Sequence, residues 1–206
     1  LQTYSLGQEL LKDMPNGLQR LAKMGYTELE IFGYKEDSGK FGDYSADNTT
    51  FIAPKDYKKM VDDAGMKITS SPSLRDYTKE NMSKFEEFWK KATDIHAELG
   101  VTCMVQPSLP RIENEDDAKR VCDIFNRAGE ITKSAGILWG YHNHSNEFKR
   151  VLKAGEKPDP NRKPWDKPQG TYIEELFLKN TDPSKVMFEL DVYWAVMGQQ
   201  DPLEWL

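Results

Sequence analysis

The sequence has few of the features that mark several large classes of protein. It contains only two cysteines, Cys103 and Cys122, outside any Cys-x-x-Cys pair, so neither a disulfide framework nor a thiolate metal site is indicated. No window of about 18 apolar residues occurs, so no membrane-spanning helix is expected. Acidic residues outnumber basic ones by 34 to 28 without a basic cluster, so nucleic-acid binding is not expected.

Motifs for nucleotide binding and for nucleophilic acyl transfer are missing as well. No Gly-x-Gly-x-x-Gly or Gly-x-x-x-x-Gly-Lys-Ser follows the first predicted strand, and no Gly-x-Ser-x-Gly occurs. Neither cysteine has a plausible base nearby, which disfavours a thiolate nucleophile. The apolar fraction of 38% suffices for a sizeable core in 206 residues. We therefore expect a folded domain that binds a small polar or metal-bound ligand.

Both ends of the chain look cut rather than finished. The chain begins inside an apolar segment, residues 1–6, and stops at residues 201–206, which resemble the start of a helix. No signal peptide is visible. We expect an incomplete C-terminus. The sequence does not decide the cellular compartment, which is either the cytoplasm or, if a leader is removed, the periplasm.

One pattern recurs along the chain, in which an amphipathic helix ends near a glycine and a short β-prone run follows. In residues 16–33, for example, a helical apolar stripe ends at Gly25 before the strand-like run 27–32. Six strands are predicted in this way, at residues 2–6, 27–32, 67–71, 101–106, 137–142 and 186–194. Strands that alternate with helices predict right-handed crossovers and a parallel sheet.

Such a sheet is either open and doubly wound or closed into an eight-stranded barrel. The missing glycine motifs and the polar residues at several strand ends favour the barrel. The prediction is an α/β fold, a (β/α) TIM barrel in one domain over residues 1–206, with six βα units visible and the last two strands absent. Two long loops, residues 33–50 and 149–170, follow strand ends, and we expect them to lie on the rim or cover the site.

Residues 137–148, ILWGYHNHSNEF, gather histidines, asparagines and a glutamate at one strand end. Because side chains alternate along a strand, His142 and His144 point the same way, about 7 Å apart. This spacing suits one metal ligand beside one acid/base group, or two ligands of one ion. Glu147 lies just beyond, where the chain turns into a loop.

Two further strands carry paired carboxylates on one face. Glu189 and Asp191 lie two apart in an apolar run, and Asp191, nearer the strand end, is the better candidate for a metal ligand. Trp194, just beyond, is either one wall of a sugar site or a core residue. Glu28 and Glu30 share the face opposite two aliphatic residues, and Glu30 is either a partner of a substrate hydroxyl or a structural carboxylate.

Weaker candidates lie at other strand ends or in helices. His96 falls in the middle of a predicted helix and is assigned to a helix face without a role. The side chains that either bind a ligand or merely finish a strand are Tyr4, Ser70, Ser71, Gln106 and Ser108.

Three segments, taken in order, resemble the sugar phosphate isomerase/epimerase family of xylose isomerase-like TIM barrels. They are GYTELEIFG at 25–33, GYHNHSNEF at 140–148 and FELDVYWAVMGQQDP at 188–202. The resemblance implies a divalent metal, Mn²⁺, Mg²⁺ or Zn²⁺, at the C-terminal mouth of the barrel. Asp191 matches an aspartate ligand of the family. His142 stands where the family has a glutamate ligand, so either His142 replaces it or Glu147 reaches back to do so.

The resemblance also implies the chemistry, which is proton abstraction beside the carbonyl of a keto-sugar through an enediolate. His144 and Glu147 are the acid/base candidates, and return of the proton gives isomerisation or epimerisation. The predicted enzyme is a metal-dependent sugar isomerase or epimerase. The predicted substrate contacts are Glu30, Trp194, Gln106 and Tyr4.

Two other functions stay open. Loss of a neighbouring oxygen substituent would make the same site a lyase of 3-keto-glycosides, and a sugar-binding barrel without catalysis is the other alternative. Related metal-dependent endonucleases are disfavoured by the acidic charge balance. The expected partner is a small sugar, phosphorylated or not, and a homo-oligomer stays open.

Overall fold

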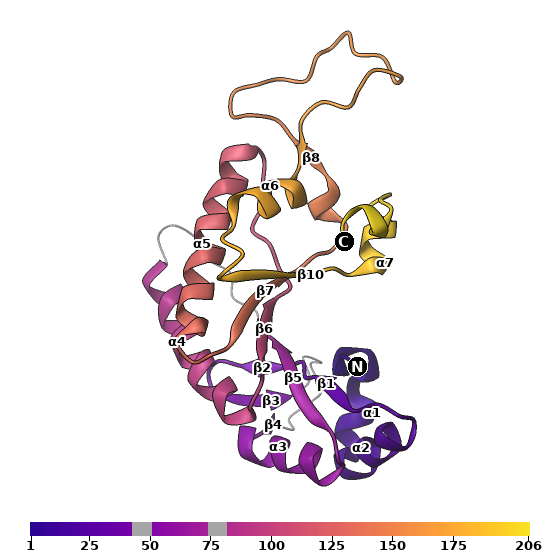
Figure 1. Ribbon diagram of the computed structural model, residues 1–206, viewed down its shortest axis with the longest axis vertical. Helices are drawn as coiled ribbons and strands as arrows, with labels where there is room; N and C mark the ends of the chain where they lie inside the picture. The colour runs from indigo at the N-terminus through magenta and orange to yellow at the C-terminus, as the bar shows by residue number, and fades with distance from the viewer. Residues whose placement is uncertain (43–50, 74–81) are drawn as a thin grey trace.

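The computed structural model describes residues 1–42, 51–73 and 82–206, in which a curved parallel sheet carries helices along its convex side (Figure 1). The strand order is β1-β5-β6-β7-β10, and each neighbouring pair is parallel. The strands are β1 (Glu28–Glu30), β5 (Lys67–Pro72), β6 (Cys103–Gln106), β7 (Leu138–His142) and β10 (Val186–Glu189). This sheet is an incomplete barrel, as the sequence predicts.

The predicted alternation of helices and strands is confirmed. The longer helices are α2 (Met14–Lys23), α3 (Pro54–Asp63), α4 (Met82–Leu99), α5 (Glu115–Lys133) and α6 (Ile173–Asn180). The shorter ones are η1 (Thr3–Leu6), α1 (Gly7–Lys12), η3 (Asn146–Phe148), α7 (Val192–Met197) and η4 (Pro202–Glu204). Gly25 and Gly136 follow α2 and α5 with φ of +96° and +74°, a left-handed conformation that a side chain disfavours.

The core lies between the sheet and the helices. Leu29 of β1 and Ile31, the residue after this strand, are completely buried, which leaves the alternate polar residues Glu28 and Glu30 for the opposite, concave face. On β7, the rings of Trp139 and Tyr141 both lie 4.9 Å from the ring of Phe125 in α5. Burial of each such ring contributes roughly 1.5–3 kcal/mol, so these contacts fix α5 against β7.

The first predicted strand, residues 2–6, is wrong. Only Gln2 forms a bridge to Glu30 before η1 begins. The Thr3 hydroxyl accepts the Phe32 N–H at 2.9 Å, where a longer strand would offer a main-chain carbonyl. A side-chain acceptor therefore ends the pairing after one residue.

The last predicted strand, residues 186–194, is too long. It ends at Glu189, and α7 begins three residues later. The Asp191 side chain accepts the Trp194 N–H at 2.8 Å, which is the hydrogen bond of a helix N-cap. Trp194 therefore lies on a helix and not at a strand end.

The two long loops are folded in different ways. The described part of residues 33–50 contributes to a small antiparallel sheet, and the rest of that loop lies outside the described residues. This sheet contains β2 (Tyr34–Lys35), β3 (Lys40–Gly42) and β4 (Phe51–Ile52). The loop 149–170 starts and ends in the antiparallel pair β8 (Arg150–Val151) and β9 (Thr171–Tyr172). Between them, residues 153–169 form a projection that we call the arm, which extends away from the sheet (Figure 1).

No helix within the described ranges combines the length and the apolar character needed to cross a bilayer.

Candidate active site at the strand ends

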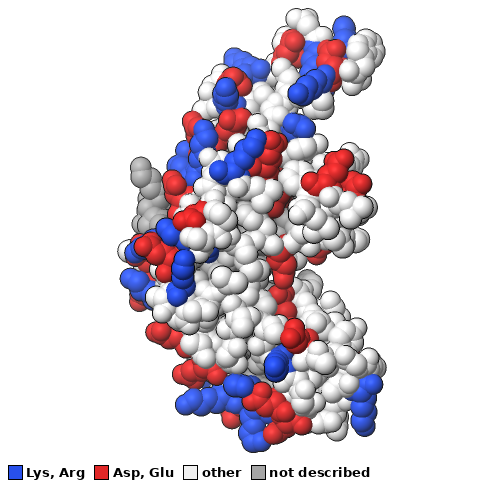
Figure 2. All heavy atoms as spheres, in the orientation of Figure 1, with Lys and Arg blue, Asp and Glu red and all other residues white. Residues whose placement is uncertain are grey.

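A pocket of about 630 Å³ opens where β1, β7 and β10 end, the edge at which TIM barrels carry their sites. Its polar lining combines four acidic side chains and one imidazole with five neutral polar groups. These residues are Glu28, Glu30, Glu189, Asp191, His142, Gln2, Ser5, Thr69, Ser70 and Tyr193. Acidic side chains lie in the notch on the concave side of the molecule (Figure 2).

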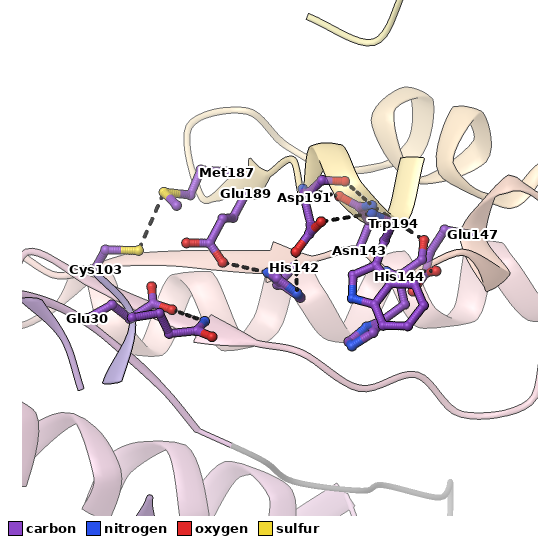
Figure 3. Close-up of polar contacts among 11 residues, drawn as sticks. Glu30, Cys103, His142, Asn143, His144, Glu147, Met187, Glu189, Asp191 and Trp194 are labelled. Carbon is purple, nitrogen blue, oxygen red and sulfur yellow. Dashed lines mark hydrogen bonds and ion pairs between the residues drawn. The ribbon is translucent and has the colours of Figure 1, made fainter. Parts of the chain in front are cut away.

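His142 is the last residue of β7 and lies directly opposite Glu189 in the ladder with β10. Its Nδ1 lies 2.7 Å from Glu189 Oε2, and its Nε2 lies 3.8 Å from Asp191 Oδ2 (Figure 3). Because Nδ1–H donates to Glu189, Nε2 is the nitrogen that remains for Asp191 or a cation. Burial opposes the charged imidazole, but the hydrogen bond and charge of Glu189 outweigh burial and raise the pKa of His142.

Asn143 fastens the end of β7 to the end of β10. Only 1% of this residue is exposed, and its Oδ1 accepts the Asp191 N–H at 2.8 Å while its Nδ2 donates to the Asp191 carbonyl at 3.4 Å. The main chain of Asp191 is thus held by an amide from the strand that carries His142. Sequence reasoning assigned no role to Asn143, because its partner is set by strand pairing and not by local sequence.

Glu30 and Glu189 form a hydrogen-bonded pair of carboxyl groups in the pocket. Burial and the charge of Glu189 raise the pKa of Glu30, and Gln2 donates a further hydrogen bond to it. Burial opposes the charge on Glu189, but the hydrogen bond from His142 outweighs burial and lowers the pKa of Glu189. A proton shared within the pair therefore favours Glu30 over Glu189.

His144 lies beside this group, with its ring centroid 5.1 Å from that of His142 and 5.2 Å from that of Trp194. His144 follows the end of β7 and Trp194 follows the end of β10, so the site continues past the pocket toward α7 (Figure 3). Burial and the nearby imidazole of His142 lower the pKa of His144. Neither His144 nor Trp194 lines the pocket itself.

Glu147, predicted to act as an acid/base or as a metal ligand, lies behind β7 and outside the pocket. It is only 2% exposed, one carboxylate oxygen accepts the Tyr141 hydroxyl, and the other accepts the His144 N–H at 3.0 Å. Both oxygens therefore hold the chain that follows β7. The strand ends at His142 and the chain turns into η3, so the alternation that governs the strand does not extend to Glu147.

Two predicted substrate contacts also lie outside the pocket. Gln106 is buried and donates to the Ser108 hydroxyl at 2.7 Å, so it stabilises the turn after β6. Tyr4 is 67% exposed, and its ring packs on Phe32 with a centroid distance of 4.9 Å. Of the four predicted contacts, Glu30 lines the pocket and Trp194 adjoins His144.

His96, assigned to a helix face without a role, is completely buried. Its Nδ1–H donates to the Ala92 carbonyl at 2.7 Å, and its Nε2 accepts from Ser71 and Ser73 at 3.0 and 3.3 Å. Burial lowers its pKa to about 4, so it is neutral near pH 7. Its hydroxyl partners come from β5 and the residue after it, which a helical pattern alone does not reveal.

The pair His142 and Asp191 fits part of a metal site. Among the residues that the structure describes, no group of three or more His, Cys, Asp or Glu side chains converges on one point. Ligand atoms about 2.1 Å from a tetrahedral ion lie about 3.4 Å apart, so the 3.8 Å between Nε2 and Oδ2 requires a small shift. A carboxylate on the other ring nitrogen, here Glu189, is usual for a metal-binding histidine.

A partial parallel barrel with carboxylates and histidines at its C-terminal strand ends defines a TIM-barrel protein whose pocket has the location of an enzyme site. The sequence profile described as xylose isomerase-like TIM barrel matches residues 18–169. The chain belongs to this family. No curated protein matches the sequence.

Two similar solved structures are described as sugar phosphate isomerase/epimerases from Parabacteroides distasonis. One is 84% identical with a TM-score of 0.94, and the match covers all of this chain and 71% of that one. The other is 42% identical with a TM-score of 0.84, and the match covers all of this chain and 72% of that one. A D-psicose 3-epimerase, 13% identical with a TM-score of 0.61 over 92% of this chain and 61% of its own, shares the fold.

Proposed function

We propose that the protein is a divalent-metal-dependent isomerase or epimerase of a sugar or keto-sugar. The observation that carries the proposal is the convergence of His142 Nε2 and Asp191 Oδ2, with Glu189 on the far nitrogen of the imidazole. The relatives described as sugar phosphate isomerase/epimerases support the reaction class. A bound Mn²⁺, Mg²⁺ or Zn²⁺ would polarise the substrate carbonyl and stabilise the enediolate that follows proton removal.

In this proposal, His142 and Asp191 hold the metal and Glu189 orients His142. Asn143 keeps the two strand ends in register, so the two ligands stay at a fixed separation. Such support is needed because small displacements of reacting groups cost large factors in rate.

His144 is the proposed acid/base group. It is partly exposed, follows the ligand strand by two residues, and lies against the ring of Trp194. Glu147 does not share this role, and its bond to the His144 N–H fixes the main chain that carries the imidazole. Trp194 then shields the same imidazole from water on one side.

Glu30 is the proposed partner of a substrate hydroxyl. It faces the pocket with a hydrogen-bonding neighbour on each side, Gln2 and Glu189. A carboxyl group accepts hydrogen bonds, and it also donates one when it carries a proton, which suits the hydroxyls of a sugar.

The charge of the pocket favours an unphosphorylated substrate. Four carboxylates line it, and no lysine or arginine does so among the described residues. Phosphate recognition normally uses arginine, lysine or an unoccupied helix N-terminus, and the start of α7 beside this pocket is already capped by the Asp191 carboxylate. We therefore propose a neutral sugar or keto-sugar, although the relatives are described as sugar phosphate isomerase/epimerases.

Metal content tests the ligand assignment. The purified protein, equilibrated with Mn²⁺, Mg²⁺ or Zn²⁺ and desalted, should retain one of these ions, and His142→Ala and Asp191→Asn should not. Asparagine is a good N-cap, so Asp191→Asn removes the charge while preserving the start of α7. The matched control is Asp201→Asn, at a second N-cap outside the pocket. Retention of metal by both site variants, or its absence from the parent protein, would overturn the assignment.

Solvent exchange tests the chemistry. Incubation with a panel of ketoses and 3-keto-glycosides in D₂O should place deuterium beside the carbonyl and produce an isomer or epimer. Release of the glycosidic substituent would identify the lyase alternative. Tight sugar binding without any exchange would identify a binding protein and contradict the proposed enzyme.

A further inference from the structure

The arm, residues 153–169, is not used by the proposed function. Every residue of the arm is exposed, and Trp165 is 81% exposed. Figure 1 shows the arm extending from β8 and β9 away from the sheet, and no arm residue lines the pocket. The arm therefore does not act as a lid for the site of its own chain.

The arm is ordered by contacts within itself. Asp159 N–H donates to Gln169 Oε1 at 3.0 Å, and the Arg162 guanidinium donates to the carbonyls of Asp166 and Lys167 at 2.9 and 3.3 Å. Four prolines restrict the main chain further, namely Pro158, Pro160, Pro164 and Pro168. A segment that is already restricted loses little conformational freedom when it binds.

The base of the arm is fixed to the barrel. Thr171 donates its hydroxyl hydrogen to Glu115 at 3.0 Å, and the Glu115 N–H donates to the Leu152 carbonyl at 3.0 Å. The Arg150 guanidinium lies 3.8 Å from the centre of the Tyr172 ring. Both sides of the arm thus meet the start of α5, so the barrel sets the direction in which the arm points.

The charge of the arm is opposite to that of the rest of the chain. The arm contains five basic and three acidic residues, a net charge of +2, whereas the whole chain carries −6, which leaves −8 on the remainder. Its three acidic side chains accept hydrogen bonds from main-chain N–H groups of the arm. Within the described residues, none of its five basic side chains is paired with a carboxylate.

We propose that the arm docks on a second copy of this chain, with the arm of each copy against the acidic body of the other and Trp165 buried in the contact. A twofold arrangement satisfies both arms at once, because each copy supplies one cationic arm and one anionic body. Tryptophan and arginine are the residue types that dominate protein interfaces, and complementary charge directs the encounter.

Sedimentation equilibrium over a concentration series tests this proposal. The protein should be a dimer whose dissociation constant rises with salt. Trp165→Ala and the double variant Lys157→Glu/Lys167→Glu should each weaken the dimer by about tenfold or more. The matched control is Tyr26→Ala, at an exposed aromatic residue outside the arm, which should leave the dimer unchanged.

All residues of the arm are exposed, and among the residues that the structure describes its hydrogen bonds stay within the arm, so the arm variants should keep the circular dichroism spectrum and melting temperature of the parent protein. A parent protein that stays monomeric at the highest concentration would overturn the proposal. A dimer that both arm variants leave intact would overturn it as well.

Discussion

Each face of β7 lies beside a pair of glutamates, and the two pairs have different surroundings. On the pocket side, Glu30 and Glu189 accompany His142 beside open solvent. On the helix side, Glu147 and Glu174 are both at least 96% buried, since their exposed fractions are 2% and 4%. The first cluster is reachable by a ligand, and the second is sealed by α5 and α6.

The difference shows how one strand separates reactive groups from supporting ones. In the sealed cluster the hydrogen bonds are made within the protein. Glu147 accepts one from the Tyr141 hydroxyl and one from the His144 N–H. Glu174 has one carboxyl oxygen, Oε2, without a hydrogen-bond partner among the described residues. Burial, with the charge of Glu147, raises the pKa of Glu174 to about 8. A buried acid that stays protonated avoids a second charge beside Glu147.

The largest expected effect concerns Glu174 and pH. Its carboxyl group ionises near 4.5 in the unfolded chain and near 8 in the fold, so unfolding becomes easier as pH rises from about 4.5 to about 8. The free energy of unfolding should fall by an amount on the order of a few kcal/mol over this range. Glu174→Gln should abolish that fall, as measured by urea unfolding at several pH values. Glu175→Gln, at the neighbouring and more exposed glutamate, should keep it, and an equal pH profile for both variants would contradict the buried-acid interpretation.

The second effect concerns Glu189 on the pocket side. Glu189→Gln weakens the acceptor of the His142 N–H and should lower metal affinity by about 10–100-fold, with little change in the melting temperature. Isothermal titration with Zn²⁺ or Mn²⁺ measures the affinity. Glu28→Gln is the control, because Glu28 lines the same pocket without contacting His142. Equal losses in both variants would point to the general charge of the pocket and not to the orientation of His142.

The smallest effect concerns Tyr141 on the sealed side. Tyr141→Phe leaves one oxygen of the buried Glu147 without its donor and should cost about 1–3 kcal/mol of stability. Metal affinity should stay within a few-fold of the parent value. Tyr193→Phe, at a tyrosine that is 61% exposed, should change stability by less than about 0.5 kcal/mol. A large loss of metal affinity in Tyr141→Phe would show that the two faces are not independent.

Much of the fold follows from local patterns. The buried pair Leu29 and Ile31 beside glutamates of the concave face, and the glycines after the helices, place four of the six predicted strands close to their observed positions. The first and last predicted strands were harder to place, because side-chain hydrogen bonds there replace the main-chain hydrogen bonds of a sheet. Thr3 stops the first strand and Asp191 starts a helix, and each depends on one hydrogen bond.

The site was predictable only where side chains alternate on a strand. His142 and Asp191 come together because His142 ends β7 and Asp191 follows the end of the adjacent strand β10, an adjacency that the βα pattern implies. Glu147 could not be placed, since it follows a turn, and the partners of Asn143 and His96 lie 48 and 25 residues away in the sequence. The importance of Glu189 depends on strand register, which a single sequence does not specify.

The pairing of Glu189 directly across from His142 also bears on how this protein tolerates change. A parallel ladder fixes that spacing through main-chain hydrogen bonds, independently of the loops that surround the opening. Rim segments are thus free to diverge or be exchanged by an engineer to admit other sugars. A shift of one residue in the pairing of these two strands would instead turn the His142 imidazole or the Glu189 carboxylate toward the helices, and this single change would abolish the proposed metal site.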